Sequence, residues 1–167
     1  MLTLRFQSTV PWTISTGWLV AADECNWFGI TCNVKDFGNG IGVQNAVTAI
    51  DLPSNNLGGR IPADLGLLRS LRRIDLRFQS SNGALSGPLP ASIGQWSDLE
   101  YVDFNFNSFN GTLPQSIGKW GRIVQALFDK NNFTGKVPNG ICAAANLTYL
   151  WADCLSKVNC TCCTVCI

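Results

Sequence analysis

The feature that most constrains the fold of this 167-residue chain is a phrase that recurs about every 24 residues. Four copies of a Gly-x-apolar-Pro element mark it, at 59–62, 87–90, 111–114 and 135–138. The apolar residues that open successive copies are Val47, Leu71, Leu99, Ile123 and Leu147, with spacings of 24, 28, 24 and 24 residues. A fixed period of this size predicts a solenoid, in which each copy buries its apolar side only against its neighbours.

Each copy has an internal pattern. Val102 and Phe104 alternate with more polar residues, and this period of two predicts a short strand. Asn107, at the ninth position, can both donate to and accept from the backbone of adjacent turns. Gly111 permits close backbone approach, and Pro114 disfavours a second regular ladder. We therefore expect a coil with one strand side and one loosely wound side.

The chain follows the pattern L-x-x-L-x-L-x-x-N-x-L-x-G-x-I-P, which resembles the plant-type extracellular leucine-rich repeat. The full matches are Val47/Ile50/Leu52/Asn55/Leu57, Leu99/Val102/Phe104/Asn107/Phe109 and Ile123/Ala126/Phe128/Asn131/Phe133. The resemblance runs from Cys25 to Cys154. It departs in the second copy, where Gln79 takes the Asn column and four extra residues precede Leu85.

The resemblance implies an α/β-type solenoid: a short right-handed leucine-rich repeat coil with a parallel concave sheet and disulfide-stabilised caps. Residues 1–46 would form the N-terminal cap, with apolar residues between Leu2 and Leu19 covering the first coil. Residues 47–146 would form four repeats, and residues 147–167 a terminal half-repeat with a Cys-rich cap. The segment from Asp36 to Gly42 is expected to be a loop.

Charge and composition argue against several functions. Lys plus Arg number 12 and Asp plus Glu number 11, so the net charge of +1 gives no case for a nucleic-acid partner. Histidine, the commonest general base and metal ligand, does not occur in the sequence. Without a nucleophile motif or a Gly-rich phosphate loop, we expect no enzyme, no cofactor and no metal. No stretch reaches the ~20 apolar residues of a membrane span.

Eight cysteines gather at the two ends: Cys25, Cys32, Cys142, Cys154, Cys160, Cys162, Cys163 and Cys166. In a small domain they indicate disulfides and an oxidising compartment. The phrase from Cys25 to Cys32 resembles the N-terminal cap of plant-type repeats, where the two cysteines bond to each other. A redox-active pair is disfavoured, because the spacing is wider than C-x-x-C.

The six C-terminal cysteines allow fifteen pairings, among which the sequence does not choose. Their arrangement resembles the caps of leucine-rich repeat proteins predicted in algae more than those of land plants. The alternative is a thiolate metal cluster, which the missing histidine disfavours.

Two features bear on localisation. The cysteines indicate an exported protein, yet the opening MLTLRFQSTV lacks the apolar core of a signal peptide. We therefore expect a truncated chain of an extracellular or cell-surface protein. Asn-x-Thr acceptors for glycans occur at Asn110, Asn132 and Asn146, in predicted turns next to strands. A fourth, Asn159, lies against Cys160, which argues against its use.

The strand face offers the candidate binding site. Counting the first apolar residue of a repeat as position one, positions 2, 3, 5, 7 and 8 are expected to face outward. Tyr, Trp and Arg dominate binding hot spots, although scattered surface aromatics need no explanation. The candidates are Arg73, Arg77, Phe78, Tyr101, Asp103, Phe106, Tyr149 and Trp151. The sequence thus predicts a module that binds a protein or peptide, with a polysaccharide as a further candidate ligand. The alternative is a structural or adhesive glycoprotein without a single tight ligand.

Two further patterns have alternatives. Asp51, Asp75 and Asp103 share one column, and we favour charge pairing with Arg73 and Arg77 over a calcium site or an acid/base pair. The insertion 79–84, with the turn signal Asn-Gly, is either a contact element or an insertion tolerated on the surface.

Overall fold

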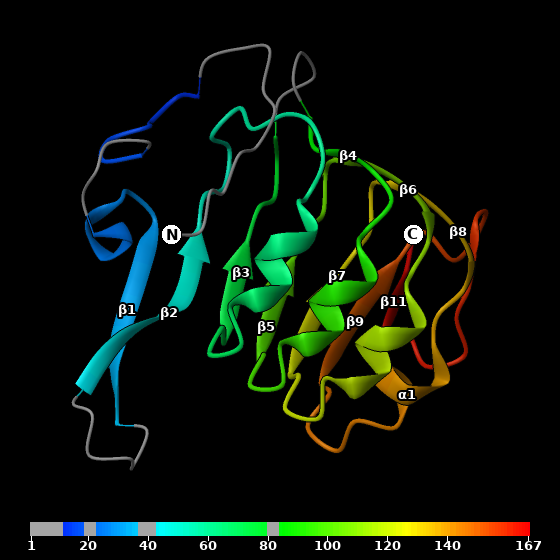
Figure 1. Cartoon of the computed structure of the whole chain (residues 1–167). Coiled ribbons are helices and arrows are strands. Elements are labelled where there is room, and N and C mark those ends of the chain that lie inside the picture. Colours follow the sequence, from blue (N-terminus) through cyan, green and yellow to red (C-terminus); the bar gives the residue numbers. More distant parts are fainter. Residues whose placement is uncertain (1–11, 19–22, 37–42, 80–83) are drawn as a thin grey trace.

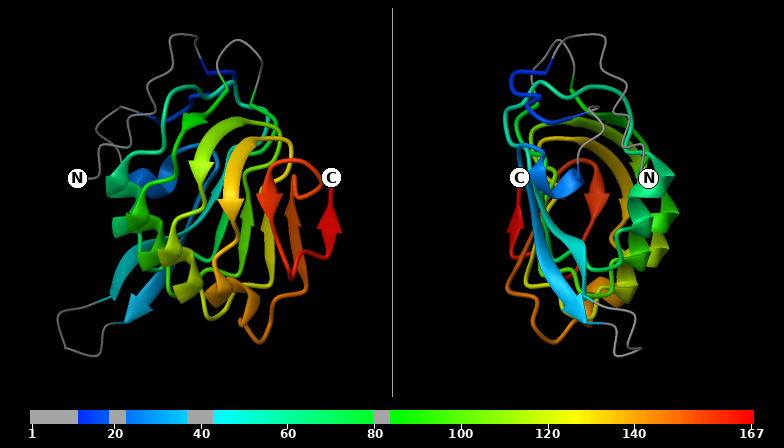
Figure 2. Two further views of the ribbon diagram at one scale, coloured as in Figure 1. Left: turned by 90° about the vertical axis from the view of Figure 1, so that its right-hand side faces the viewer. Right: turned by 60° about the vertical axis from the view of Figure 1, so that its left-hand side comes forward.

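The computed structural model describes residues 12–18, 23–36, 43–79 and 84–167. Within these ranges the chain winds into a coil with a seven-stranded sheet on one side and a four-stranded sheet and short helices on the others (Figure 1, Figure 2). The apolar residues from Leu2 to Phe6, Leu19, the loop after Asp36 and the turn at 82–83 lie outside the described residues.

The seven-stranded sheet has the order β1-β2-β3-β5-β7-β9-β11. Its strands are β1 (Ile30–Asp36), β2 (Val43–Asp51), β3 (Arg73–Asp75), β5 (Tyr101–Asp103), β7 (Gln125–Leu127), β9 (Tyr149–Ala152) and β11 (Val165–Cys166). From β2 onward neighbouring strands are parallel, and β1 pairs antiparallel with β2. The predicted alternation is confirmed, because the inward residues Ile50, Ile74, Val102, Ala126 and Leu150 align across the sheet and are fully buried.

The chain leaves each short strand through a turn at the eighth position of the repeat. Ser54, Phe78, Phe106 and Lys130 hold this position, and each has a positive φ of 52–56°. An ordinary side chain rarely adopts this conformation, since its Cβ crowds the backbone. The repeated turn therefore points the eighth side chain away from the core at the same place in every coil.

A second sheet, with the order β10-β8-β6-β4, contradicts the expectation of a loosely wound side. Its strands are β4 (Ser86–Gly87), β6 (Ser108–Thr112), β8 (Asn132–Lys136) and β10 (Val158–Asn159), and Figure 2 shows them as a separate wall of the coil. Pro114 does not prevent this ladder, because it lies two residues after Thr112, the last residue of β6, and its missing N–H is not needed there.

Short 3-10 helices close each coil. They are η1 (Glu24–Asn26) in the cap and η2 (Ala63–Leu67), η3 (Ala91–Gln95) and η4 (Gln115–Lys119) in the repeats, followed by the α-helix α1 (Asn139–Cys142). A proline precedes each of the last four helices. Its fixed φ suits this place, and the N–H it lacks would have no partner within the helix.

The helices stack closely through small residues and tryptophans. A Cβ atom on Gly94 would lie only 2.4 Å from the Cβ of Ser116, so glycine is needed for this approach. The buried rings of Trp96 and Trp120 stack with centroids 6.1 Å apart. Their Nε1 atoms donate to the carbonyl oxygens of Leu65 and Ile93 in the preceding repeat, at 3.0 and 2.9 Å.

The core is built mainly from leucine and isoleucine, with a cluster of four phenylalanines in the third and fourth repeats. Phe104, Phe109, Phe128 and Phe133 are at most 1% exposed, and neighbouring rings lie 5.5–6.3 Å apart. Full burial of each such ring contributes roughly 1.5–3 kcal/mol. Because the rings of these two repeats contact each other, the two repeats stabilise one another.

Amide side chains at the ninth position connect the coils. Asn107 Nδ2 donates to three backbone carbonyls at 2.8–3.2 Å, and its Oδ1 accepts from the N–H of Leu85. Asn131 repeats this arrangement one coil further on. The expected role of the Asn column is confirmed. Gln79, the departure from the pattern, fills the same role with its longer side chain and five backbone hydrogen bonds.

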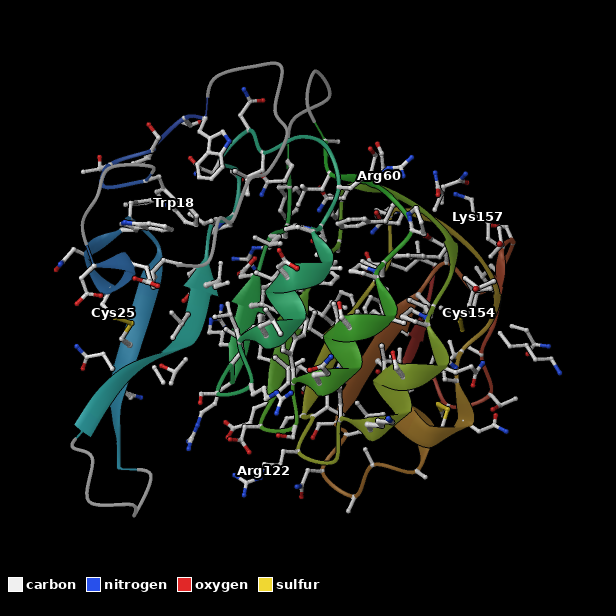
Figure 3. All side chains as sticks on the ribbon, viewed as in Figure 1. Trp18, Cys25, Arg60, Arg122, Cys154 and Lys157 are labelled. Carbon is white, nitrogen blue, oxygen red and sulfur yellow. A yellow bond between two sulfur atoms is a disulfide. The ribbon has the colours of Figure 1, made fainter. Side chains whose placement is uncertain are left out.

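Disulfides close both ends of the coil. Cys25 bonds to Cys32 in the N-terminal cap, where Trp18 packs between Trp12 and Trp27 with ring centroids 4.8 and 4.7 Å apart. At the other end the pairs are Cys142–Cys162, Cys154–Cys166 and Cys160–Cys163. Figure 3 places Cys25 and Cys154 at opposite ends of the array.

Candidate binding site on the concave face

The outward side of the seven-stranded sheet, with the turn residues that follow it, is called here the concave face. A ladder of charged side chains crosses its first half. Arg73 Nε lies 2.6 Å from Asp51 Oδ1 and Arg73 Nη2 lies 3.2 Å from Asp75 Oδ2. Arg77 then bridges Asp75 at 3.6 Å and Asp103 at 3.5 Å. The predicted charge pairing of this column is confirmed.

Two carboxylates of the ladder are buried. Asp75 and Asp103 are 1% and 0% exposed, and each Oδ1 accepts a backbone N–H, from Arg77 and Asn105 respectively. Burial raises the pKa of both carboxyls. The expectation that Asp103 is open to a ligand is therefore wrong, because the side chains of Arg77 and Tyr101 bond to its Oδ2. Asp103 holds its neighbours in place.

Tyr101 is fixed by two contacts. Its hydroxyl donates to Asp103 Oδ2 at 3.1 Å, and the guanidinium carbon of Arg73 lies 3.9 Å from the centre of its ring. Burial, followed by the nearby carboxylates of Asp103 and Asp75, raises the pKa of Tyr101 to about 12. The half-buried pair of Arg73 and Tyr101 is thus a rigid platform whose side chains lose little freedom on binding.

Phe78 and Phe106 form an exposed aromatic pair at the edge of the same face. Their rings stack with centroids 4.2 Å apart and an angle of 18°, and the two residues are 45% and 41% exposed. Both residues hold the eighth position of their repeats, where the turn points the side chain outward. With Lys130 they line a hollow of about 430 Å³ that also includes Ala84 and Ser108.

Two more candidates lie toward the C-terminal end. The register Tyr101–Gln125–Tyr149 places the two tyrosines in one line across the sheet, with Gln125 between them. Tyr149 is 46% exposed, whereas Trp151 is half-buried next to Leu127. The structure thus brings the candidates together on one face, as a platform, a stacked pair and a C-terminal group.

Asn105 and Asp129 are two concave-face residues that sequence reasoning did not single out. Both hold the seventh position, which was expected to be exposed, yet they are 8% and 2% exposed. No hydrogen-bond partner reaches the Oδ1 atom of either side chain. The sequence signal for Asn105 and Asp129 is a polar residue at an outward position next to a turn. Their burial could not be predicted from it, because it depends on neighbouring strands.

The glycan acceptors lie away from the concave face. Asn110 and Asn132 are exposed and lie inside β6 and β8, rather than in turns as expected, while Asn146 is exposed in a turn before β9. Among the described residues, no group of His, Cys, Asp or Glu is placed to hold a metal ion. In the same residues no helix has the length and apolarity needed to cross a bilayer.

The fold and the repeated Asn column define a leucine-rich repeat protein. The family model "Leucine Rich Repeat" matches residues 98–120. The brassinosteroid LRR receptor kinase BRL3 of Oryza sativa subsp. japonica is 34% identical over 105 residues, 62% of this chain and 8% of the relative. The chain thus spans less than a tenth of that relative's length.

Solved structures agree with this class. A pollen receptor kinase 3 structure superimposes with a TM-score of 0.68 at 26% identity, covering 92% of this chain and 68% of that one. The plant peptide hormone receptor RGFR1, in complex with RGF2, gives a TM-score of 0.61 at 27% identity, covering 77% and 21%. The repeat pattern and the fold of this chain are those of the plant extracellular type of leucine-rich repeat protein.

Proposed function

We propose that this protein is an extracellular binding module that recognises a protein or peptide through its concave face. The observation that carries the proposal is the gathering of rigid or exposed aromatic and Arg side chains on that one face. Phe78, Phe106 and Tyr149 are each more than 40% exposed, and Tyr101 and Arg73 form the fixed platform beside them. Aromatic and Arg anchors combine large contact area with few rotamers to freeze.

The comparisons support a peptide or protein ligand. One similar structure is named a plant peptide hormone receptor and was solved with RGF2, and the rice relative is named a receptor kinase. Four disulfides suit an oxidising environment, which supports an extracellular or cell-surface location. A concave face built from fixed side chains fits recognition better than chemistry, because it is an open strand surface on which water is not excluded.

A second candidate function is an adhesive or structural glycoprotein. Asn110 and Asn132 favour it, because they are register partners on the adjacent strands β6 and β8 and both side chains are exposed. Glycans on both would cover much of that wall of the coil. The two functions differ in one measurable property, since only the first requires a partner whose binding depends on the concave face.

The test compares two double variants. Phe106→Ala with Tyr149→Ala removes two exposed concave anchors, and Leu67→Ala with Lys119→Ala removes exposed groups from the helical side. Partners are captured from the native extracellular fluid with the wild type and then titrated individually. The concave variant should keep its melting temperature and weaken binding by at least ~2 kcal/mol, or about thirtyfold. The helical-side variant should bind as the wild type does.

Equal binding by the concave variant and the wild type would contradict the proposal. The insertion offers a specific alternative outcome: if shortening residues 80–83 abolishes binding while the concave variant binds normally, the insertion is the contact site.

A further inference from the structure

Four buried side-chain polar atoms have no hydrogen-bond partner among the described residues, and three of them belong to the concave face. These three are Asn105 Oδ1, Asp129 Oδ1 and Trp151 Nε1. The fourth, Trp27 Nε1, is in the N-terminal cap. A buried polar atom without a partner is costly and uncommon in a folded protein, so each asks for an explanation.

The three residues come from three consecutive strands. Asn105 and Asp129 extend β5 and β7, and the N–H of Phe106 donates to the carbonyl of Asp129 at 3.2 Å, so the two extensions lie side by side. Trp151 is on β9, where it pairs with Leu127 of β7. Neighbouring strands are about 4.8 Å apart, so Asn105 and Asp129 are direct neighbours, and Trp151 is on the next strand, in register with the residue two before Asp129.

The neighbouring carboxylates have structural partners that Asp129 Oδ1 lacks. Both oxygens of Asp153 accept backbone N–H groups, from Lys130 at 2.9 Å and Asn131 at 3.0 Å. Asp103 accepts from Asn105, Tyr101 and Arg77. The fold therefore accounts for Asp103 and Asp153, while the free oxygen of Asp129 contributes no hydrogen bond to it.

The electrostatic setting favours a positive ligand group. Burial raises the pKa of Asp129 and the charge of Asp153 adds to this, whereas a hydrogen bond from its own backbone N–H and the charge of Lys130 oppose it. Asp103 is a further carboxylate that interacts with Asp129. A cation placed against the free oxygen would offset both the loss of hydration and the repulsion between carboxylates.

We propose that Asn105, Asp129 and Trp151 form a subsite for a Lys or Arg side chain of a peptide ligand, an inference that rests on the proposed function. The ammonium or guanidinium group donates to Asn105 Oδ1 and Asp129 Oδ1 and lies against the Trp151 ring. The indole N–H donates to a main-chain carbonyl of the same peptide. This assignment gives a partner of the correct type to each of the three atoms.

Entry to the subsite requires a local rearrangement. The three atoms are closed to water, so the ligand cation has to displace neighbouring side chains. Lys130 is exposed, follows Asp129 directly and lowers the pKa of its carboxyl. Lys130 is therefore the chain's own competitor for this position, and removing its charge should favour the ligand.

The test uses acetyl-arginine amide as the probe, titrated into the whole protein while the indole N–H resonances are followed by NMR. The Trp151 resonance, assigned with Trp151→Phe, should shift with this probe, and hardly with the neutral acetyl-norleucine amide. Asp129→Asn keeps the shape and removes the charge, and should weaken the probe by about thirtyfold or more. Lys130→Gln should strengthen it. Asp64→Asn, at an exposed site in η2, is the matched control and should change nothing.

Acidification provides an independent readout. Protonation of Asp129 removes the negative charge, so the affinity for the probe should fall as the pH falls through the raised pKa. This dependence should disappear in Asp129→Asn. Stability distinguishes a binding role of Asp129 from a structural one. If the role is binding, Asp129→Asn should fold at least as stably as the wild type, whereas a structural role would make the variant less stable.

Three results would overturn the inference: a shift of equal size with the neutral probe, unchanged affinity in Asp129→Asn, or a lower melting temperature of that variant. The proposed function is tested separately by the variant of Phe106 and Tyr149. If that variant loses its partner while Asp129→Asn keeps it, the concave face binds a ligand but this subsite does not hold a cation.

Discussion

Gln79 is the side chain whose replacement tests the amide ladder most directly. Its Oε1 accepts from the N–H groups of Asn55 and Leu57 at 3.2 and 2.8 Å, and its Nε2 donates to three carbonyls. Gln79→Met keeps the length and volume of the side chain and removes every one of these bonds. Any loss of stability is then due to the hydrogen bonds and not to a cavity.

The expected loss follows from which groups have no other partner after the change. The carbonyl of Leu76 still accepts from Asn107 Nδ2, and that of Arg77 still accepts from the N–H of Ser54. The cost therefore falls mainly on the amides of Asn55 and Leu57 and on the carbonyl of Leu52, at about 1–3 kcal/mol for each buried unpaired group. We expect a total of about 3 kcal/mol, which for a chain of this size lowers the melting temperature by about 6–12 °C.

Guanidinium unfolding with the disulfides intact measures the total, and amide hydrogen exchange locates it. Exchange should accelerate at Asn55 and Leu57 in Gln79→Met, while Gln115→Met, at an exposed site in η4, should stay within ~0.5 kcal/mol of the wild type. A destabilisation by Gln79→Met as small as that of the control, or unchanged exchange at the two amides, would refute the role of the ladder.

The other predictions concern the core, the caps and pH. Phe104→Ala should cost ~3–5 kcal/mol in chemical unfolding, because its ring is fully buried, and a cost below 1 kcal/mol would contradict the strand register. Replacing Cys25 and Cys32 together by Ser should cost about 2–5 kcal/mol, and intact-mass measurement should show that reduction adds eight hydrogens, two for each of the four disulfides. Because burial raises the pKa of Asp129, the folded state holds this proton more tightly than the unfolded chain. The stability of the wild type relative to Asp129→Asn should therefore decrease as the pH rises from the ordinary carboxyl pKa through the raised one, and an increase would contradict this sign.

The repeated columns made most of the array predictable. Val102 and Phe104 could be assigned to the core because their alternation recurs in neighbouring copies, and Asn107 could be assigned to the ladder because of its fixed position. The antiparallel strand β1 lies in the cap and has no repeat to reveal it. The strands of the second sheet do recur, but in most copies they contain a glycine and precede a proline, and these residues argue against a strand.

The burial of concave residues could not be predicted from one strand alone. Asp103 lies at an outward position, yet it is fully buried, and Arg77 of the neighbouring repeat and Tyr101 both bond to its Oδ2. Asp129 is hidden for a similar reason, since its burial depends on the surrounding side chains. The pattern along one strand predicts the direction in which each side chain points. The exposure of that side chain also depends on the length and charge of residues one coil away.

The last strand, β11, has a consequence for how such an array can change in length. It pairs with β9 in parallel register, and Cys166 is bonded to Cys154, so the final segment occupies the place where a further coil would add its strand. A duplicated repeat therefore fits only between the two disulfide-bonded ends. Gain or loss of whole 24-residue units inside the array would widen or narrow the concave face while the caps remain the same.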